Sequence, residues 1–157
     1  MKRKWCISIG IVIMFLLVIY FLYPRPLSRF IEKEGSFMVF GIDSDVPYES
    51  VFQGYYIDSE DEAFNQLRAC LSGYYYHPNL RTALVSNTDS YLYGKRITIK
   101  YEWKEGGETK LITLVIRDVG YIEINDRPYR VGYWGNGKSE QLMERVEEIL
   151  ADHASAE

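Results

Sequence analysis

Histidine and cysteine are scarce in this sequence of 157 residues, which contains two of each. A zinc site needs three or four histidine, cysteine or acidic ligands at close spacing, and neither His77 nor His153 has such neighbours. Gly106-Gly107 and Gly135-x-Gly137 lack the lysine and the serine or threonine that a phosphate-binding loop requires at fixed spacing. Cys6 falls in an apolar run and Cys70 in a predicted helix, so we expect no disulfide and interpret Cys70 as a buried structural thiol. The sequence predicts no metal site, no cofactor and no catalytic residues.

Positive charge is in short supply beyond residue 34. Residues 1–34 carry six basic and two acidic side chains, a net charge of +4, whereas the remainder carries twelve basic and twenty acidic ones, a net charge of −8. An acidic domain repels phosphate backbones, so nucleic acid is not an expected partner. The same repulsion disfavours docking of the domain on an anionic lipid surface.

Charge is absent altogether from Trp5–Tyr23. As a helix that rises about 1.5 Å per residue, this run of nineteen residues spans about 28 Å, close to the thickness of bilayer hydrocarbon. A helix satisfies every backbone amide within the segment, and Tyr20 and Tyr23 suit the membrane interface. We therefore expect residues 5–23 to form an uncleaved transmembrane anchor, with the lipid bilayer as its partner.

Two alternatives compete with this anchor. A cleaved signal peptide has an apolar core of about 7–15 residues and a small-residue cleavage site, whereas this run is longer and ends in Tyr-Pro-Arg-Pro. A buried core helix of such uniform apolarity would be unusual in so short a chain. Lys2, Arg3 and Lys4 outnumber Arg25 and Arg29, which favours an N-terminus in the cytoplasm. The prediction is a single-pass signal-anchor protein of the cell membrane with its C-terminal domain outside.

The predicted organisation has five parts, with the two prolines after the apolar run ending the anchor helix. Residues 1–4 form a cytoplasmic N-terminus, 5–23 the transmembrane anchor, 24–35 a connector, 36–150 an extracytoplasmic α+β domain and 151–157 a disordered tail.

Alternation of apolar and polar residues predicts the strands, most clearly in Arg96–Trp103. Lys104–Gly107 is the expected hairpin loop, and Asn125-Asp126 is the expected two-residue turn of a second hairpin. The expected strands are 36–42, 51–57, 96–103, 109–117, 121–124 and 129–133, with 43–50 as a loop and 81–85 as a further short candidate.

Two helices are expected in the domain. Ser59-x-x-Glu62 indicates a capping box at the start of the first helix, Gly73 ends it, and Ser139 caps the second. Each has an apolar stripe at helical spacing, which would pack it against a sheet. The predicted fold class is α+β: an N-terminal transmembrane helix, then a mainly antiparallel sheet with two helices packed on one face.

Three patches of the domain together resemble a known kind of protein. They are Tyr56-Ile57-Asp58-Ser59-Glu60-Asp61-Glu62, the Ile97–Ile116 hairpin, and Ile122-x-Ile124-Asn125 followed by Tyr129. This combination resembles the small extracytoplasmic domains of lipoproteins and membrane-anchored proteins in Firmicutes-type bacteria, and it covers most of residues 36–150. Those families have no assigned activity, so the resemblance implies a bacterial envelope setting and transfers no functional residues.

Tyrosine is the one residue in excess, with 14 copies. Aromatic rings on a surface bind sugars or partner proteins because they offer a large apolar area at a small entropic cost. Tyr74, Tyr75, Tyr76 and Trp134 form the predicted contact surface. The alternative interpretation is that these rings pack within a tyrosine-rich sheet.

The first hypothesis is a non-catalytic interaction domain in the cell envelope, with an envelope protein as partner, because this function needs no catalytic residue, metal or cofactor. A module that binds cell-wall glycan through the aromatic residues is the second hypothesis. An enzyme of a type without a recognised motif is the third.

Overall fold

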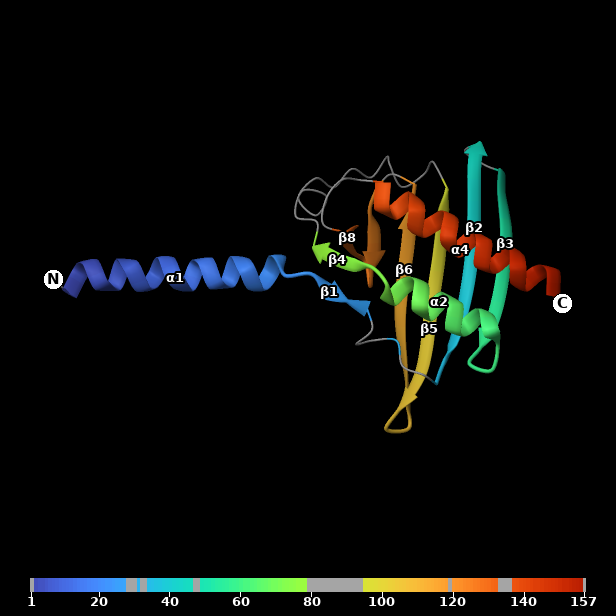
Figure 1. Cartoon of the computed structure of the whole chain (residues 1–157), viewed down its shortest axis with the longest axis horizontal. Helices are drawn as coiled ribbons and strands as arrows, with labels where there is room; N and C mark the ends of the chain where they lie inside the picture. Colours follow the sequence, from blue (N-terminus) through green and yellow to red (C-terminus); the bar gives the residue numbers. More distant parts are fainter. Residues whose placement is uncertain are drawn as a thin grey trace.

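A computed structural model of the chain describes residues 2–27, 31, 34–46, 49–78, 95–118, 120–132 and 137–156. An N-terminal helix is followed by a domain of strands and helices (Figure 1). The elements are α1 (Lys2–Leu22), β1 (Arg25–Pro26), β2 (Ser36–Val46), β3 (Glu49–Asp58), α2 (Glu62–Ser72), β4 (Tyr75–Pro78), β5 (Arg96–Glu105), β6 (Glu108–Arg117), β7 (Ile122–Ile124), β8 (Arg127–Val131) and α4 (Gly137–Ala156).

The described strands form one sheet of eight, in the order β1-β4-β8-β7-β6-β5-β2-β3. Each pair of neighbours is antiparallel. Strands β5 to β8 are consecutive neighbours and form a four-strand meander, whereas β2 adds to β5 with β3 outside it. The predicted α+β class with a mainly antiparallel sheet is confirmed.

Two tight turns set the register of the meander. Asn125 and Asp126 have φ values of 48° and 62°, and Gly106 and Gly107 have values of 61° and 85°. A positive φ at both central residues defines the type I′ turn, whose twist matches that of the flanking strands. The Asn125-Asp126 turn lies where the sequence predicts it. The Gly106-Gly107 turn lies at the end of the predicted loop Lys104–Gly107, whose first two residues belong to β5.

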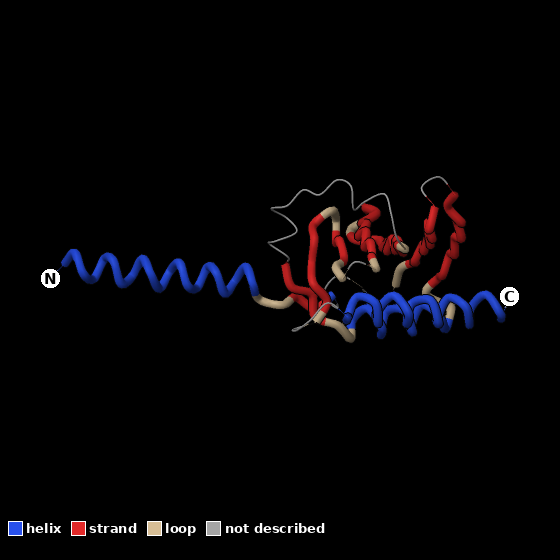
Figure 2. Tube along the Cα trace, turned by 90° about the horizontal axis from the view of Figure 1, so that it is seen from above, coloured by secondary structure: helices blue, strands red, loops and turns tan. Residues whose placement is uncertain are grey.

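Helices α2 and α4 lie side by side on one face of the sheet, as the sequence predicts (Figures 1 and 2). Their stripes meet the inward side chains of the strands in one core. The helices contribute Ala63, Phe64, Leu67, Leu71, Leu142, Met143, Val146, Ile149 and Leu150, and the sheet contributes Phe37, Val39, Ile57, Tyr76, Ile97, Ile99, Tyr101, Ile112, Leu114, Ile116, Ile122 and Val131.

The start of α2 differs from the prediction. The helix begins at Glu62 with Asp61 as its N-cap, rather than at a capping box on Ser59. The Asp61 carboxylate instead accepts the backbone N–H of Asp58 at 2.8 Å, and the Ser59 hydroxyl donates to the Asp58 carboxylate at 3.0 Å. These local bonds hold 58–61 in a turn that precedes the helix. Gly73 follows the helix as its C-cap, as predicted.

Helix α4 is longer than the prediction at both ends. It begins at Gly137, so Ser139 is a buried first-turn residue and not the cap. It continues to Ala156, so residues 151–156 are helical where a disordered tail was expected. Alanine, which has the highest helix propensity, occurs at positions 151, 154 and 156 and favours this extension.

The connector belongs to the core, so the folded unit begins before Ser36. Leu27 and Ile31 are only 2% and 3% exposed. The Tyr101 hydroxyl donates to the backbone oxygen of Glu34 at 3.3 Å. A side chain on Gly35 would meet the Tyr101 ring and the oxygen of Glu102 at 2.6 Å, so glycine permits this close approach.

Strands β1 and β4 were not predicted, and β2 and β3 differ most from their predicted lengths. Strand β1 forms one edge of the sheet and pairs with β4. Pro26 lies in this edge strand, and Pro78 ends β4 beyond the residues that pair with β1, so each proline occupies a position that needs fewer backbone donors. Strands β2 and β3 extend into the predicted loop at 43–50. The strand candidate at 81–85 lies outside the described residues.

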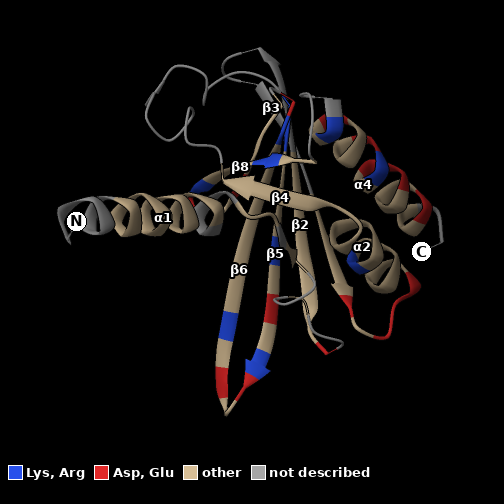
Figure 3. Ribbon diagram, turned by 60° about the vertical axis from the view of Figure 1, so that its left-hand side comes forward, with Lys and Arg blue, Asp and Glu red and all other residues tan. Residues whose placement is uncertain are grey.

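Helix α1 stands clear of the sheet and its two covering helices (Figure 1). Its described side chains, those of residues 8–19, carry no charge (Figure 3). The large apolar ones among them are between 45% and 64% exposed, in contrast to the domain core. In the part of the chain that the structure describes, no helix is both long and apolar enough to cross a membrane.

Candidate functional site

The predicted contact residues do not share one surface. Tyr74 is half-buried and packs against the core, Tyr75 is 47% exposed, and Tyr76 is 1% exposed. Tyr75 and Tyr76 are successive residues of β4, so their side chains point to opposite faces of the sheet. Trp134 lies outside the described residues.

Tyr76 is a core residue with a satisfied hydroxyl. It donates a hydrogen bond of 2.7 Å to the backbone oxygen of Leu71, which ties β4 to the end of α2. Burial holds the pKa of this hydroxyl well above its usual range, because a phenolate would lose its hydration. The ring of Tyr76 is therefore part of the core and not of a contact surface.

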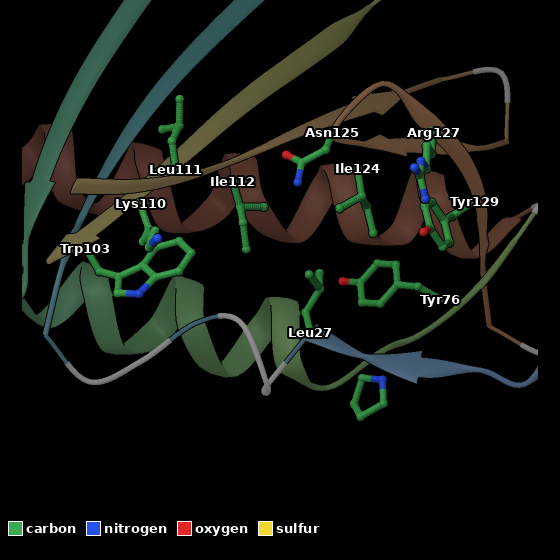
Figure 4. A pocket seen from close by; sticks show the side chains of 11 residues that line it. Leu27, Tyr76, Trp103, Lys110, Leu111, Ile112, Ile124, Asn125, Arg127 and Tyr129 are labelled. Carbon is green, nitrogen blue, oxygen red and sulfur yellow. The ribbon is translucent and has the colours of Figure 1, made fainter. Parts of the chain in front are cut away.

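A pocket lies beside this tyrosine, between the connector and the lower part of the meander. Its volume is about 520 Å³, which falls within the range of small-molecule sites. Figure 4 shows its walls, which come from the connector, all four meander strands and β4. The lining residues are Pro26, Leu27, Tyr76, Trp103, Lys110, Leu111, Ile112, Ile124, Asn125, Arg127 and Tyr129. We call it the connector pocket.

Apolar side chains form most of the connector pocket. Ile112 and Ile124 lie in its middle, with Trp103 toward one end and Tyr129 toward the other (Figure 4). The indole of Trp103 is stacked on Tyr101, with ring centroids 5.3 Å apart and an interplanar angle of 18°. This stacking fixes the indole, so the pocket has a pre-formed aromatic wall.

Two cations border the pocket, one at each end (Figure 4). Lys110 is paired with Trp103 across β5 and β6, and its ammonium lies 3.1 Å from the carboxylate of Glu108. Because that ion pair is well exposed, it contributes little to the free energy of folding, and Lys110 can exchange Glu108 for another anionic partner. Arg127 makes no ion pair among the described residues.

The type I′ turn supplies the third polar group of the connector pocket. The side-chain oxygen of Asn125 accepts the backbone N–H of Thr113 at 3.0 Å, and the backbone N–H of Asn125 donates to the Thr113 oxygen at 2.9 Å. These two bonds fix the side chain and leave its NH₂ group as a donor. Arg127 and Asn125 therefore provide donors close together on one hairpin, and no acidic residue belongs to the lining.

A second hollow, of about 610 Å³, separates α2 from α4 and is bordered by Cys70, Tyr74, Arg145 and Glu148. Burial raises the pKa of the Cys70 thiol to about 11, although nearby Arg145 lowers it. The thiol is therefore protonated at neutral pH, which disfavours nucleophilic chemistry. This agrees with the structural interpretation of Cys70.

The opposite face of the sheet carries an ion pair that is almost fully buried. Arg117 Nε lies 3.1 Å from Glu123 Oε1, with side-chain exposures of 8% and 13%. The guanidinium also lies over the ring of Tyr121, 6.0 Å from its centroid. These contacts join β6 to β7, and we interpret the pair as a structural link.

Among the described residues, no group of three or more His, Cys, Asp or Glu side chains is placed to hold a metal ion. Comparison of the chain with protein-family models, with curated proteins and with solved structures found no match.

Sequence reasoning missed Trp103, Lys110 and Arg127 as site residues. The signal was present, because the turn at Gly106-Gly107 fixes the register that places Lys110 opposite Trp103. The turn at Asn125 and Asp126 likewise places Arg127 beside Ile124. What the sequence did not indicate is that the connector would fold back over these residues.

Proposed function

We propose that this chain is a membrane-anchored interaction domain that α1 holds at the outer face of the cell membrane. The observation that carries the proposal is the exposure of apolar side chains along α1, between 45% and 64% for its large residues from Ile9 to Ile19. Leaving so many such side chains in water is costly, at about 25 cal/mol for each Å². A bilayer removes that cost without any contact to the domain.

The anchor is proposed for the whole run Trp5–Tyr23. The twelve residues at 8–19 whose side chains are described would span only about 18 Å as a helix, whereas hydrocarbon is about 30 Å thick. The full run of nineteen uncharged residues reaches about 28 Å. The charge difference between Lys2, Arg3 and Lys4 and the far side supports the orientation with the domain outside.

Contact, rather than chemistry, is the proposed activity of the domain. The connector pocket supports it because a largely apolar hollow with a few placed polar groups is the usual form of a binding site. The divergence of Tyr75 and Tyr76 weakens the case for a glycan stacked on the tyrosine triplet. An interaction domain is therefore preferred to a glycan-binding module.

Fractionation and a reporter fusion test the proposal. The full-length chain is expected in the membrane fraction, resistant to extraction by alkaline carbonate. A reporter that is active only outside the cytoplasm, fused after Glu157, is expected to be active. A matched variant with Ile13→Arg and Leu16→Arg should leave the membrane, because each arginine at the centre of a span costs about 2.5–3.5 kcal/mol.

A shortened protein released into the medium would refute the anchor. Activity of a reporter that works only in the cytoplasm would refute the orientation while leaving the anchor in place.

A further inference from the structure

The connector pocket has a charge opposite to that of the domain around it. Residues 35–157 carry a net charge of −8, yet the pocket lining contains Lys110 and Arg127 and no acidic residue. In a protein with a surplus of carboxylates, a hollow whose charged lining residues are both basic attracts an anion. The remaining lining is mostly aliphatic and aromatic, which suits an apolar group.

We propose that the connector pocket binds an anionic amphiphile, a molecule with an acidic head and an apolar tail. The acidic head would lie at Arg127, whose guanidinium makes no ion pair within the described residues, and would accept a second bond from the NH₂ of Asn125. The tail would lie along Ile112 and Ile124 toward the indole of Trp103 (Figure 4). Lys110, which already has Glu108 as a partner, adds a weaker attraction at the other end.

The connector places this pocket near the proposed bilayer. Helix α1 ends at Leu22, and Pro26 already lines the pocket. Four residues span at most about 13 Å when extended, and the headgroup layer on each side of the hydrocarbon is about 5–8 Å thick. An anionic phospholipid of the same membrane is thus the nearest source of the ligand, and this source rests on the proposed anchor.

The general repulsion between the acidic domain and an anionic membrane does not oppose this binding. Repulsion of that kind acts over a Debye length, about 8–10 Å at physiological salt. A single headgroup that reaches Arg127 is attracted by a charge closer than that. The inference therefore concerns one bound molecule and not a membrane-docked surface.

Two arginines of β8 provide a matched pair of variants. Arg127 lines the pocket. Arg130 lies three residues later in the same strand, so its side chain points to the opposite face of the sheet, and it pairs in register with His77. Arg127→Gln and Arg130→Gln change the net charge equally. Both arginines are exposed, so both variants are expected to unfold at the wild-type temperature.

The test uses the full-length chain in a neutral detergent, mixed with equal amounts of dioctanoyl phosphatidylglycerol and dioctanoyl phosphatidylcholine. Native mass spectrometry then counts the bound lipid. The wild type is expected to bind the anionic lipid about tenfold more strongly, equivalent to about 1.4 kcal/mol. Arg127→Gln should abolish that preference, Arg130→Gln should keep it, and Lys110→Gln should reduce it about twofold.

A second arm identifies the source of the ligand. If decanoate competes with phosphatidylglycerol in the wild type and decanol does not, the pocket accepts free anionic amphiphiles as well as lipid. If only phosphatidylglycerol binds, the ligand is a membrane lipid. Both results support the inference, provided that Arg127→Gln removes the binding.

Three results would overturn it: equal binding of the two lipids, an equal loss in Arg127→Gln and Arg130→Gln, or binding of neutral cell-wall fragments that displaces the lipid. Because the assay contains no bilayer, it is independent of the anchor. A chain that leaves the membrane fraction but keeps the Arg127-dependent preference refutes the anchor and not the pocket, and the reverse pattern refutes the pocket and not the anchor.

Discussion

One face of the sheet is covered in part by helices α2 and α4 and in part by the connector, and the two parts bury different numbers of apolar side chains. Helices α2 and α4 together bury nine apolar side chains against the strands, whereas the described part of the connector buries Leu27 and Ile31. A helix returns a side chain to the same face about every 3.6 residues, so its stripe is continuous. In the connector, the Ile31 N–H donates to the Leu27 oxygen at 3.2 Å.

The helices thus cover a core of buried side chains, whereas a pocket of about 520 Å³ lies under the connector. The same strands supply both regions, because β5 contributes Tyr101 to the core and Trp103 to the pocket. A pocket thus lies where the connector, and not a helix, covers the strands.

The largest expected effect is in the helix-covered region. Leu67→Asp or Val146→Asp should prevent residues 24–157 from folding, because each introduces an unpaired carboxylate at a position with 0% exposure, at a cost of several kcal/mol. Circular dichroism with thermal melting measures it. Asn65→Asp, on the exposed side of α2, is the control and should melt as the wild type does. Wild-type melting of both core variants would show that these faces are not buried.

A smaller effect separates the two regions directly. Leu67→Ala should lower the free energy of unfolding by about 3–4 kcal/mol, since the dense core cannot close around the new cavity. Leu27→Ala should lower it by only about 1–2 kcal/mol, because Leu27 already borders an open pocket. Urea denaturation of residues 24–157 measures both. Equal losses would mean that the connector packs as tightly as the helices do.

The smallest effect concerns thiol reactivity in a Cys6→Ser background. Burial disfavours the thiolate and so raises the pKa of Cys70 to about 11. At pH 8 its alkylation should be roughly a hundredfold slower than that of an ordinary cysteine, and it should rise about tenfold per pH unit toward pH 11. A cysteine placed at Lys110, at the rim of the pocket, should react at an ordinary rate. Mass spectrometry follows both, and a fast Cys70 would show that the helix layer opens.

The meander and the two covering helices could be predicted from the sequence, because their signals are local. Alternation in β5, the turn at Asn125 and Asp126, and the stripe through Leu67 each depend on neighbouring residues. The ends of α2 and α4 were harder to predict. Turn bonds at Asp58 precede the start of α2, and α4 continues through mostly exposed residues to Ala156.

The connector pocket could not be predicted, because it depends on contacts between distant segments. Leu27 lines the pocket together with residues of β6, β7 and β8 that lie roughly 85 to 100 positions later in the chain. The strand β4 was missed for the same reason, since Tyr76 is ordered by Leu71 and Val131 rather than by its own propensity. Composition identified the tyrosines as unusual, but only their alternation along β4 separated the buried ring from the exposed one.

Labelling of intact cells tests the central claim most directly. Cells that produce the Cys6→Ser, Lys110→Cys chain are treated with a membrane-impermeant maleimide, and the protein is then recovered from the membrane fraction. The account predicts full-length protein labelled at position 110 before lysis, with Cys70 unlabelled at pH 7. Labelling at position 110 only after lysis would place the domain inside the cell and contradict the account.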